Sequence, residues 1–414
     1  MSNSPMNSTT EILNSDAVCL VIKAKLKPVG DTDRFQPAGF PEVGHVIYDA
    51  PRQDGTKQKV CIVDSPASMA NHLETVCMAG PTDTSLHADL NGLPYAVVVT
   101  ERASIANGEV VVESPERNVV VTTTLSEGHR IASDYFVGEK DRPTVDGGEL
   151  DGQYFRGVLK QRFGVIDVPK KKGSSAYFAP SSWWDIYRTI FNFDPNSLVH
   201  GVMFAKEQIK ISRLLTAHHE AFGANRVGRS GVKFDQLGKT LSGQPIFSVD
   251  EETAEEIRAT FIMDLGLLRS YGRDEYGLNT AQKQLLLDLS LWKVRHLLAR
   301  PFRYRTQCFL RCTEITVETE NCVLERCPAD SDSQQERLHE AGSADANLEP
   351  TGRSTIPTLL QTIDIGASIA ACGFGNNQPT RIYFPAQKLF KAGAGSDQSA
   401  EAGDGDEEGP SEDE

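Results

Sequence analysis

The stretch LSLWKVRHLLARPFRYRTQCFLR, residues 289–311, decides the fold because a helix, a proline and a strand follow one another in it. Asn279 can cap the helix through its side chain, and apolar residues recur at helical spacing from Leu285 to Trp292. Pro301 ends the helix because it lacks the backbone N–H that would continue the hydrogen-bond ladder. Cations gather in the last turns, where the helix dipole favours positive charge: Lys293, Arg295, His296 and Arg300.

Beyond Pro301 the side chains alternate with a period of two, which predicts a β-strand. One face carries Phe302, Tyr304, Thr306, Cys308 and Leu310, and the other carries Arg303, Arg305, Gln307, Phe309 and Arg311. The second face suits a single-stranded nucleic acid, because guanidinium groups neutralise phosphates and an aromatic ring offers a stacking surface. This segment alone leaves one alternative open, an exposed strand whose charged face is simply solvated.

The net charge hides a basic central region. The whole chain has 57 acidic and 42 basic residues, a formal charge of −15 and a sequence pI near 5.1. Nine acidic residues and no basic one lie in 392–414, and six acidic residues lie in 329–350 against a single arginine. Without these two segments the charge is −1, and residues 151–305 carry +7. A basic body with separate acidic segments is compatible with a polyanionic partner.

The acidic segments define the domain organisation. Both are rich in Ser, Ala, Gly, Asp and Glu and nearly free of large apolar residues, so we expect 329–352 to be a disordered linker and 392–414 a disordered tail. The body is then predicted to span 1–328. A C-terminal segment, 353–391, is predicted to return to that body, and the apolar runs at 356–369 and 381–384 within it read as strands of the same sheet.

Composition also bounds the class of protein. A hydrophobic content of 39% is enough for a sizeable core, and no apolar run approaches the length that spans a bilayer. The polar start predicts a soluble, cytoplasmic protein with no membrane partner. Eight irregularly spaced cysteines indicate free thiols. Cys308, Cys312, Cys322 and Cys327 depart from the spacing of zinc ribbons, and core packing is favoured over a metal site.

The remaining pattern is mixed helix and strand. We expect strands at 17–27 and 59–64, and a helix at 65–80 that Ser65 caps, with Pro66 in its first turn. Residues 212–222 are expected to be helical, with Leu215, His218 and Phe222 along one side. The sequence therefore predicts an α+β fold with insertions.

A glycine-rich stretch, ANRVGRSGVK at 224–233, is the best candidate for a phosphate-binding loop. Its glycines let the backbone approach a ligand, while Arg226, Arg229 and Lys233 supply charge. It does not match the P-loop pattern, which argues against a nucleoside triphosphate site. The alternative is an ordinary flexible turn.

The sequence offers no clear catalytic motif. His218, His219 and Glu220 lack metalloprotease spacing, and no nucleophile elbow occurs. His45, His129 and His200 could serve acid–base ribonuclease chemistry, but lone histidines are more often structural. No cofactor and no metal are predicted.

Five blocks of sequence carry a resemblance to a known family. They are RFQPAGFPEVG at 34–44, VDSPASMANHLE at 63–74, SLVHGVMFAK at 197–206, SRLLTAHHEAFGANRVGRSGVK at 212–233 and LSLWKVRHLLARPFRYRT at 289–306. In this order the chain resembles the backbone subunit of type I-G (formerly I-U) CRISPR effector complexes, within the RAMP superfamily. Two departures concern RNA contacts. His72 stands where the family pattern has arginine, and SGVK replaces a double-glycine form.

The resemblance implies an RRM-like (ferredoxin-like) antiparallel palm with inserted helical, finger and thumb elements. It also implies a subunit that is not an enzyme and that binds CRISPR RNA in a filament of further copies of itself. Target DNA would be recognised through the guide, with other effector-complex subunits and a separate helicase-nuclease as partners.

Residues and resemblance together give a set of predicted RNA contacts. The phosphate-contacting loop would use Arg226, Arg229, Ser230, Gly231 and Lys233, the sheet face Arg303 and Arg305, with Arg130 and Asn71 as further candidates. Lys170–Lys172 could contact RNA or displaced DNA. Two other function classes stay open, a RAMP-type endoribonuclease that processes CRISPR RNA and a zinc-dependent nucleic-acid module.

Overall fold

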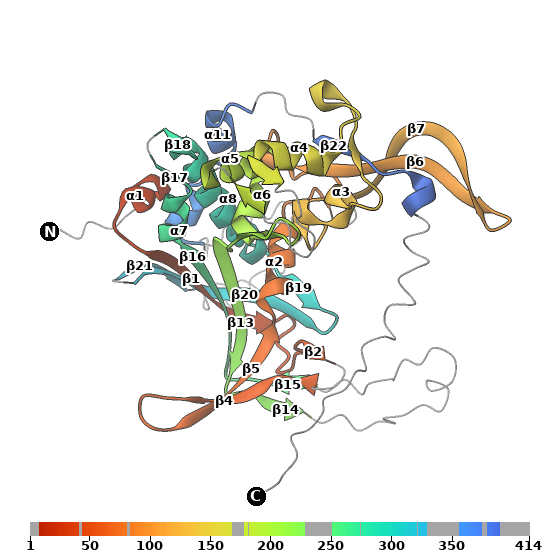
Figure 1. The fold of residues 1–414 in the computed structure, drawn as a ribbon. Coiled ribbons are helices and arrows are strands. Elements are labelled where there is room, and N and C mark those ends of the chain that lie inside the picture. Colours follow the sequence, from red (N-terminus) through yellow and green to blue (C-terminus); the bar gives the residue numbers. More distant parts are fainter. Residues whose placement is uncertain are drawn as a thin grey trace, which may run out of the picture.

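The computed structural model describes residues 8–40, 44–80, 83–167, 178–180, 182–227, 251–273, 275–320, 322–328, 356–374 and 379–389. In this part of the chain the central feature is an eight-stranded antiparallel sheet that curls from the helical body down to a hairpin at its far edge (Figure 1). Its strands run in the order β19 (Phe302–Arg305), β20 (Cys308–Thr319), β1 (Cys19–Pro28), β16 (Glu256–Asp264), β13 (Leu215–Phe222), β5 (Lys57–Asp64) and β4 (Ile47–Pro51), and β21 (Val323–Pro328) also pairs with β20.

The strands bury one face of this sheet. In β1 the side chains of Leu20, Ile22, Ala24 and Leu26 are buried, whereas the alternate residues Lys23 and Lys25 stay partly exposed. The neighbouring strands β16 and β13 alternate in the same way. A period of two sends alternate residues to opposite faces, so one face joins the core and the other remains open to solvent.

Helices cover the buried face. They are α2 (Pro66–Thr75), α5 (Trp183–Phe193), α6 (Pro195–His200) and α8 (Thr280–Leu298), which gather on one side of the sheet in Figure 1. Asn279 caps α8 and its side chain accepts from Gln282, as the sequence predicts. Most residues of α8 from Leu285 onward are buried, including Leu286, Leu289 and Trp292. A helix that is buried on all sides belongs to the core.

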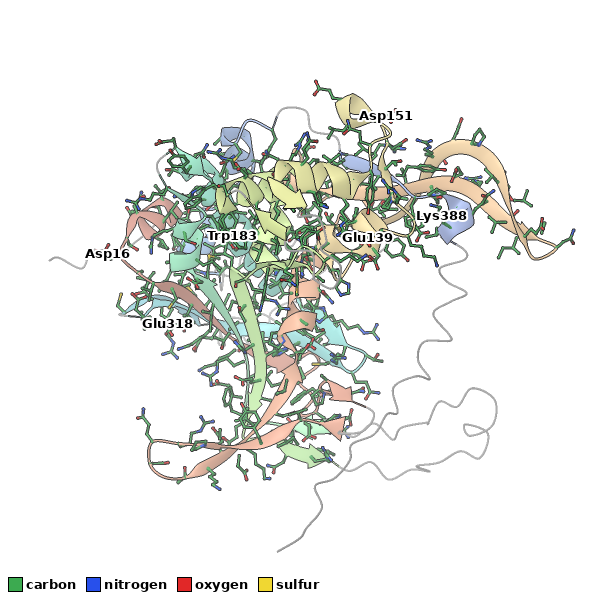
Figure 2. All side chains as sticks on the ribbon, viewed as in Figure 1. Asp16, Glu139, Asp151, Trp183, Glu318 and Lys388 are labelled. Atoms are coloured by element: carbon green, nitrogen blue, oxygen red, sulfur yellow. The ribbon has the colours of Figure 1, made fainter. Side chains whose placement is uncertain are left out.

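A second, four-stranded sheet lies beside the body, in the order β7 (Glu109–Thr123), β6 (Ala96–Ala106), β22 (Thr380–Tyr383) and β8 (Thr144–Val145). The outer part of the β6–β7 hairpin projects from the molecule with side chains on both of its faces (Figures 1 and 2). Strand β22 pairs in parallel with β6. The expectation that the C-terminal segment completes the central sheet is therefore wrong, because that segment extends the second sheet instead.

Shorter elements complete the described residues. They are α1 (Thr9–Asn14), β2 (Gly39–Phe40), β3 (Gly44–His45), η1 (Ala88–Leu90), η2 (Arg130–Ala132), α3 (Asp134–Val137), η3 (Gly148–Leu150), α4 (Phe155–Arg162), β9 (Val165–Asp167), β10 (Phe178–Pro180), β11 (Val202–Phe204), β12 (Ile209–Ile211), β14 (Asn225–Val227), β15 (Glu251–Thr253), α7 (Leu265–Ser270), β17 (Gly272–Arg273), β18 (Tyr276–Gly277), α10 (Thr358–Gln361) and α11 (Ile365–Ala371). None of the helices in these ranges is both long enough and apolar enough to cross a membrane.

Three predicted elements differ from the structure. Residues 212–222, expected as a helix, form strand β13, because pairing with β16 and β5 outweighs the helix propensity of its alanines. The predicted strand at 302–311 folds into the β19–β20 hairpin with its turn at Thr306–Gln307. The apolar run 356–369 contains α10 and α11 rather than a strand. The two segments predicted to be disordered, 329–352 and 392–414, lie outside the described residues.

Candidate nucleic-acid interface

The first of the five sequence blocks is hydrogen-bonded to three other parts of the fold. Three backbone amides of residues 35–38 donate to other parts of the fold. The amide of Gln36 donates to the carbonyl of Gln307 in the β19–β20 turn over 3.0 Å, and that of Ala38 donates to Val63 in β5 over 2.8 Å. Phe35 and Glu252 exchange two backbone hydrogen bonds of 3.0 and 2.8 Å. This segment therefore joins the β19–β20 hairpin, the start of the second block and β15.

Two arginines lie at the surface beside β15. Arg226 in β14 stands opposite Glu252, and its Nε donates to Oε1 of that buried carboxylate over 3.2 Å. Arg34 lies 3.4 Å from the carboxylate of Glu251. The side chains remain 46% and 56% exposed, respectively. Each arginine is thus held in place by a carboxylate beneath it while its outer part faces solvent.

The β19–β20 hairpin adds a guanidinium and an aromatic ring. Arg303 stands opposite Phe309 in the register of the two strands. Arg303 is exposed and makes no ion pair within the described part of the chain, while Phe309 is 46% exposed. The predicted outward face is confirmed for these two residues. Their pairing offers a cation next to a stacking surface, which is what a sequence-tolerant single-strand site uses.

We name Arg34, Arg226, Arg303 and Phe309 the arginine rim. They flank the segment 35–38, whose hydrogen bonds reach both β15 and the β19–β20 turn. Arg226 and Arg303 belong to the predicted RNA contacts. Arg34 lies in the first sequence block but is not among those contacts, because its partner Glu251 is more than two hundred positions away in the sequence.

Arg305 reaches a buried cluster with its guanidinium, while 36% of its side chain stays exposed. Its Nη2 donates to Oδ1 of Asp64 over 2.7 Å, and the other oxygen of Asp64 accepts from Ser68 and lies 2.9 Å from Nε2 of His72. Burial raises the pKa of Asp64, but the hydrogen bonds from His72, Arg305 and Ser68 outweigh it and lower the pKa to about 2. His72 and Arg305 therefore both contact the buried carboxylate of Asp64.

Arg130 is buried beneath the surface. Its guanidinium makes two hydrogen bonds to the carboxylate of Glu74, at 2.7 and 3.0 Å, and a third to the carbonyl of Gly201 at 3.2 Å. Only 6% of the residue is exposed. This arrangement favours a role in joining η2 to α2 over a role in contacting RNA.

The other predicted contacts divide between surface and undescribed chain. Asn71 is exposed on α2. Arg229, Ser230, Gly231 and Lys233 lie outside the described residues, as do Lys170–Lys172. Strands β14 and β15 pair with each other, and Arg226 lies two residues before the undescribed stretch 228–250 that separates them in sequence.

A second basic region is not apparent from the sequence. A cavity of about 500 Å³ is lined by His129, Lys210 and Arg213, with Gly201 and Thr216 among its other lining residues. Neither Lys210 nor Arg213 makes an ion pair in the described part of the chain. His129 precedes η2, Lys210 lies in β12 and Arg213 follows β12, so no single sequence motif contains all three.

The centre of the open sheet face is less positive than either region. Lys23 pairs with Glu318, Lys25 lies 3.3 Å from Glu314, and Arg258 lies 2.9 Å from Glu256. Each of these cations is paired with a carboxylate, as are Arg34 and Arg226 of the arginine rim, and a paired cation offers a phosphate only the donors that its glutamate leaves free. Among the described residues, Arg303 in the rim and Lys210 and Arg213 in the basic cavity make no ion pair, so they are better placed to hold an anion.

The residues considered for metal or acid–base chemistry are largely structural. The four cysteines at 308–327 do not converge as ligands among the described residues, and burial raises the pKa of the Cys308 thiol to about 12. His218 and His219 alternate across β13, and burial lowers the pKa of His219 to about 3. His200 is fully buried, with its Nε2 3.0 Å from Nζ of Lys293.

The solved structures that are similar to this chain at low identity include the two that follow, while no curated protein matches it in sequence. A chain of a CRISPR RNA-guided surveillance complex in its pre-nicking form is 12% identical, with a TM-score of 0.34 over 85% of this chain and 99% of that one. Csc2 from Thermofilum pendens is 10% identical, with a TM-score of 0.25 over 73% of this chain and 66% of that one. Scores this low carry no argument about the fold.

A family match settles the assignment. The model of one protein family covers residues 20–226, which is half of the chain and extends from the first central strand through Arg226. That family is described as the CRISPR-associated protein GSU0053. The CRISPR assignment predicted from the five blocks is thereby confirmed, and this protein belongs to the family of the CRISPR-associated protein GSU0053.

Proposed function

We propose that this protein is the CRISPR RNA-binding backbone subunit of a type I-G antiviral effector complex. Copies of it would polymerise along one guide RNA and present that guide to target DNA. The other effector-complex subunits and a separate helicase-nuclease would be its partners. Membership of the CRISPR-associated family supports the RNA assignment, and the arginine rim is the observation that carries it.

We propose further that four strands of the central sheet form an RRM-like palm. The relevant strands are β1, β13, β16 and β20, which lie in the spatial order β20-β1-β16-β13 and pair antiparallel throughout. Helices lie in the connection from β1 to β13, and α8 lies in the connection from β16 to β20. This is the β-α-β-β-α-β succession of the ferredoxin-like motif, and the remaining elements would be its insertions.

The chemistry of the rim suits binding without base readout. A subunit that carries any guide sequence must hold phosphates and stack bases without reading their edges. Arg34, Arg226 and Arg303 supply cations, and Phe309 supplies an aromatic face. The glycine-rich loop with Arg229 and Lys233 would continue this surface from the end of β14. Lys210 and Arg213 would provide a second place for a phosphate.

The same geometry favours a subunit that does not cut RNA. His200 is buried, and His45 is only 7% exposed, with Nδ1 held 2.9 Å from Glu252. His129 is 86% exposed, and its nearest carboxylate, Glu127, is 3.9 Å away. General acid–base catalysis needs two groups within hydrogen-bond reach of one phosphate. His129 and His200 line the same cavity, but His200 is only 1% exposed and its Nε2 lies 3.0 Å from Nζ of Lys293, while His45 lies elsewhere, beside β15.

A binding experiment with matched variants tests the proposal. Arg226→Ala with Arg303→Ala should weaken binding of a CRISPR RNA by about 1 kcal/mol or more per arginine, because each substitution removes a charge-assisted phosphate interaction. Arg229→Ala with Lys233→Ala should act in the same direction. The control is Lys206→Ala with Arg326→Ala, which removes two exposed cations that pair with Glu139 and Glu314 and are not part of the arginine rim.

The outcomes are distinct. Weaker binding by the rim variants but not by the control supports the proposal. An equal effect in both would mean that net charge alone attracts RNA. Cleavage of repeat RNA by the purified protein, abolished by His129→Ala, would replace the scaffold assignment with the endoribonuclease one.

A further inference from the structure

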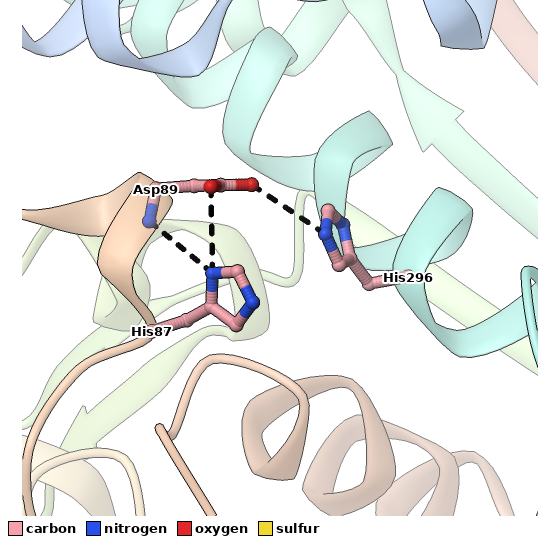
Figure 3. A group of neighbouring side chains, drawn as sticks. All are labelled: His87, Asp89 and His296. Carbon is pink, nitrogen blue, oxygen red and sulfur yellow. Dashed lines mark hydrogen bonds and ion pairs between the residues drawn. The ribbon is translucent and has the colours of Figure 1, made fainter.

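A cluster of two histidines and an aspartate lies where η1 meets helix α8, away from the arginine rim. His87 precedes η1, Asp89 lies within it, and His296 comes from the last turn of α8 (Figure 3). One ring nitrogen of each histidine and one carboxylate oxygen all lie within 4.8 Å of one another. More than two hundred residues separate His296 from the other two, so the fold itself creates this cluster.

Hydrogen bonds fix which ring nitrogen of each histidine carries a lone pair. Nδ1 of His87 accepts from the backbone amide of Asp89 over 3.2 Å, so the lone pair is on Nδ1, and Oδ1 of Asp89 is 3.7 Å away. A metal ion bound at Nδ1 would replace that amide hydrogen bond. Nδ1 of His296 lies 2.9 Å from the carbonyl of Trp292, to which it must donate. In the neutral ring Nε2 then carries the lone pair, and it faces Oδ2 of Asp89 at 3.6 Å.

Trp292 supports the cluster from the core side. Its indole Nε1 donates to Oδ2 of Asp89 over 3.1 Å, and its ring stacks on that of His296 with centroids 3.7 Å apart. Trp292 itself is fully buried. A histidine that donates its second nitrogen to a backbone carbonyl, next to a carboxylate that also accepts a hydrogen bond, is the outer shell that metal ligands usually have.

The spacing is close to that of a coordinated metal. Zinc bonds of about 2.0–2.2 Å in a tetrahedral site place ligand atoms about 3.3–3.6 Å apart. His87 lies 3.7 Å from Oδ1 of Asp89 and His296 lies 3.6 Å from Oδ2, while one ligand atom from each of the three side chains lies within 4.8 Å of the others, so side-chain rotations would bring the three to bonding distance. The three side chains are between 25% and 43% exposed, which leaves the fourth position to water.

We propose that His87, Asp89 and His296 bind one divalent transition-metal ion, for which Zn²⁺ is the reference. Two imidazoles and one carboxylate favour such an ion over Mg²⁺ or Ca²⁺, which prefer oxygen ligands. The bound ion joins η1 to α8, because it takes one ligand atom from each of the three side chains. Its role is structural, and it is independent of RNA binding at the rim.

The test is a zinc titration of the full-length protein after chelator treatment, in competition with a chromophoric chelator. The wild type should bind one high-affinity equivalent of Zn²⁺ per chain and should not bind Mg²⁺ at that site. His87→Ala with His296→Ala should remove this equivalent. Asp89→Asn, which keeps an acceptor for the Trp292 N–H, should weaken zinc binding at least tenfold. The matched control is His129→Ala, which removes an exposed histidine elsewhere and should leave zinc binding unchanged.

A second measurement covers variants that fold poorly. Zn²⁺ should raise the Tm of the wild type and of His129→Ala, but not that of Asp89→Asn, because a ligand stabilises only the state that binds it. The proposal is overturned if the wild type takes up no zinc, or if the double variant binds it as tightly as the wild type. The first result would leave the cluster as an ordinary contact between η1 and α8, and the second would place the metal on other residues.

Discussion

Buried charged residues tie the sequence blocks to one another. Asp64 of the second block receives Arg305 of the fifth, and the register of β5 and β13 places His219 of the fourth block opposite Asp64. Glu74 receives Arg130 and also Asn196, which lies next to the third block. Each pair lies in or near the core, where an unpaired charge would be costly. Several polar residues of the five sequence blocks thus stabilise the fold.

Lys293 shows how a residue-level expectation fails for a physical reason. At the end of a helix a lysine is expected to point to solvent and complement the dipole. Here the ammonium group is fully buried, hydrogen-bonded to Asn196 and 3.0 Å from Nε2 of His200. Burial lowers the pKa of Lys293, which the nearby Glu74 and Asp194 oppose. The sequence could not show this, since its partners come from another helix.

Replacement of Asp64 should reveal the strength of its cluster. Because the folded pKa of about 2 lies below the ordinary value of 3.8, the charged form stabilises the fold above about pH 4, and this contribution fades as the pH falls toward 2. Asp64→Asn should therefore lower the free energy of unfolding by about 2 kcal/mol at pH 7, by linkage alone, and by much less near pH 2.

Chemical denaturation of both proteins across this pH range measures the effect. His219 also destabilises the folded state in acid, since its low pKa keeps it neutral while the unfolded chain takes up a proton. Burial is the main cause and is common to both proteins, but the Asp64 carboxylate raises the pKa of His219, so its removal makes this acid effect larger in the variant. Asp49→Asn, at a position 53% exposed, is the control and should change little. A difference between wild type and Asp64→Asn that stays constant from pH 7 to pH 2 would contradict the account.

At the scale of elements, prediction succeeds where local signals act alone. The cap at Asn279, the first turn at Ser65–Pro66 and the strand predicted at 17–27 rest on local signals, and each is confirmed. The sequence predicts a helix in place of strand β13 because LTAHHEAF contains good helix formers, while its pairing partners β16 and β5 are distant in sequence. In the same way, the turn at Thr306–Gln307 interrupts a predicted strand, yet Arg303 and Phe309 still face outward.

The candidate site was predictable only in part. Arg303 and Arg226 lie at the surface as expected. The alternation after Pro301 predicts an outward face for Arg303, and the neighbouring glycines predict an exposed segment for Arg226. Arg130 and Arg305 are equally basic in the sequence, yet each reaches a carboxylate far along the chain. Charge alone cannot separate an arginine that binds a partner from one that holds the fold. Tertiary contacts make that distinction.

The whole molecule combines two basic regions, the arginine rim and the basic cavity, with a strongly acidic C-terminal tail. The tail 392–414 lies outside the described residues, and its composition still predicts a chain without core-forming side chains. Deletion of the tail should leave the Tm unchanged. Removal of nine negative charges should raise affinity for unrelated RNA at low salt. Thermal unfolding and binding to a non-CRISPR RNA measure the two effects, and a large fall in Tm would show that the tail belongs to the fold.

The central claim is that this protein holds an RNA backbone through phosphate contacts, and the salt dependence of RNA affinity tests it most directly. The slope of log K against log salt should be about −0.7 for each phosphate neutralised, and it should be the same for two RNAs of equal length and unrelated sequence. Arg226→Ala with Arg303→Ala should make the slope less steep by about 0.7 for each arginine removed. An affinity that does not change with salt, or that follows the RNA sequence, would contradict the account.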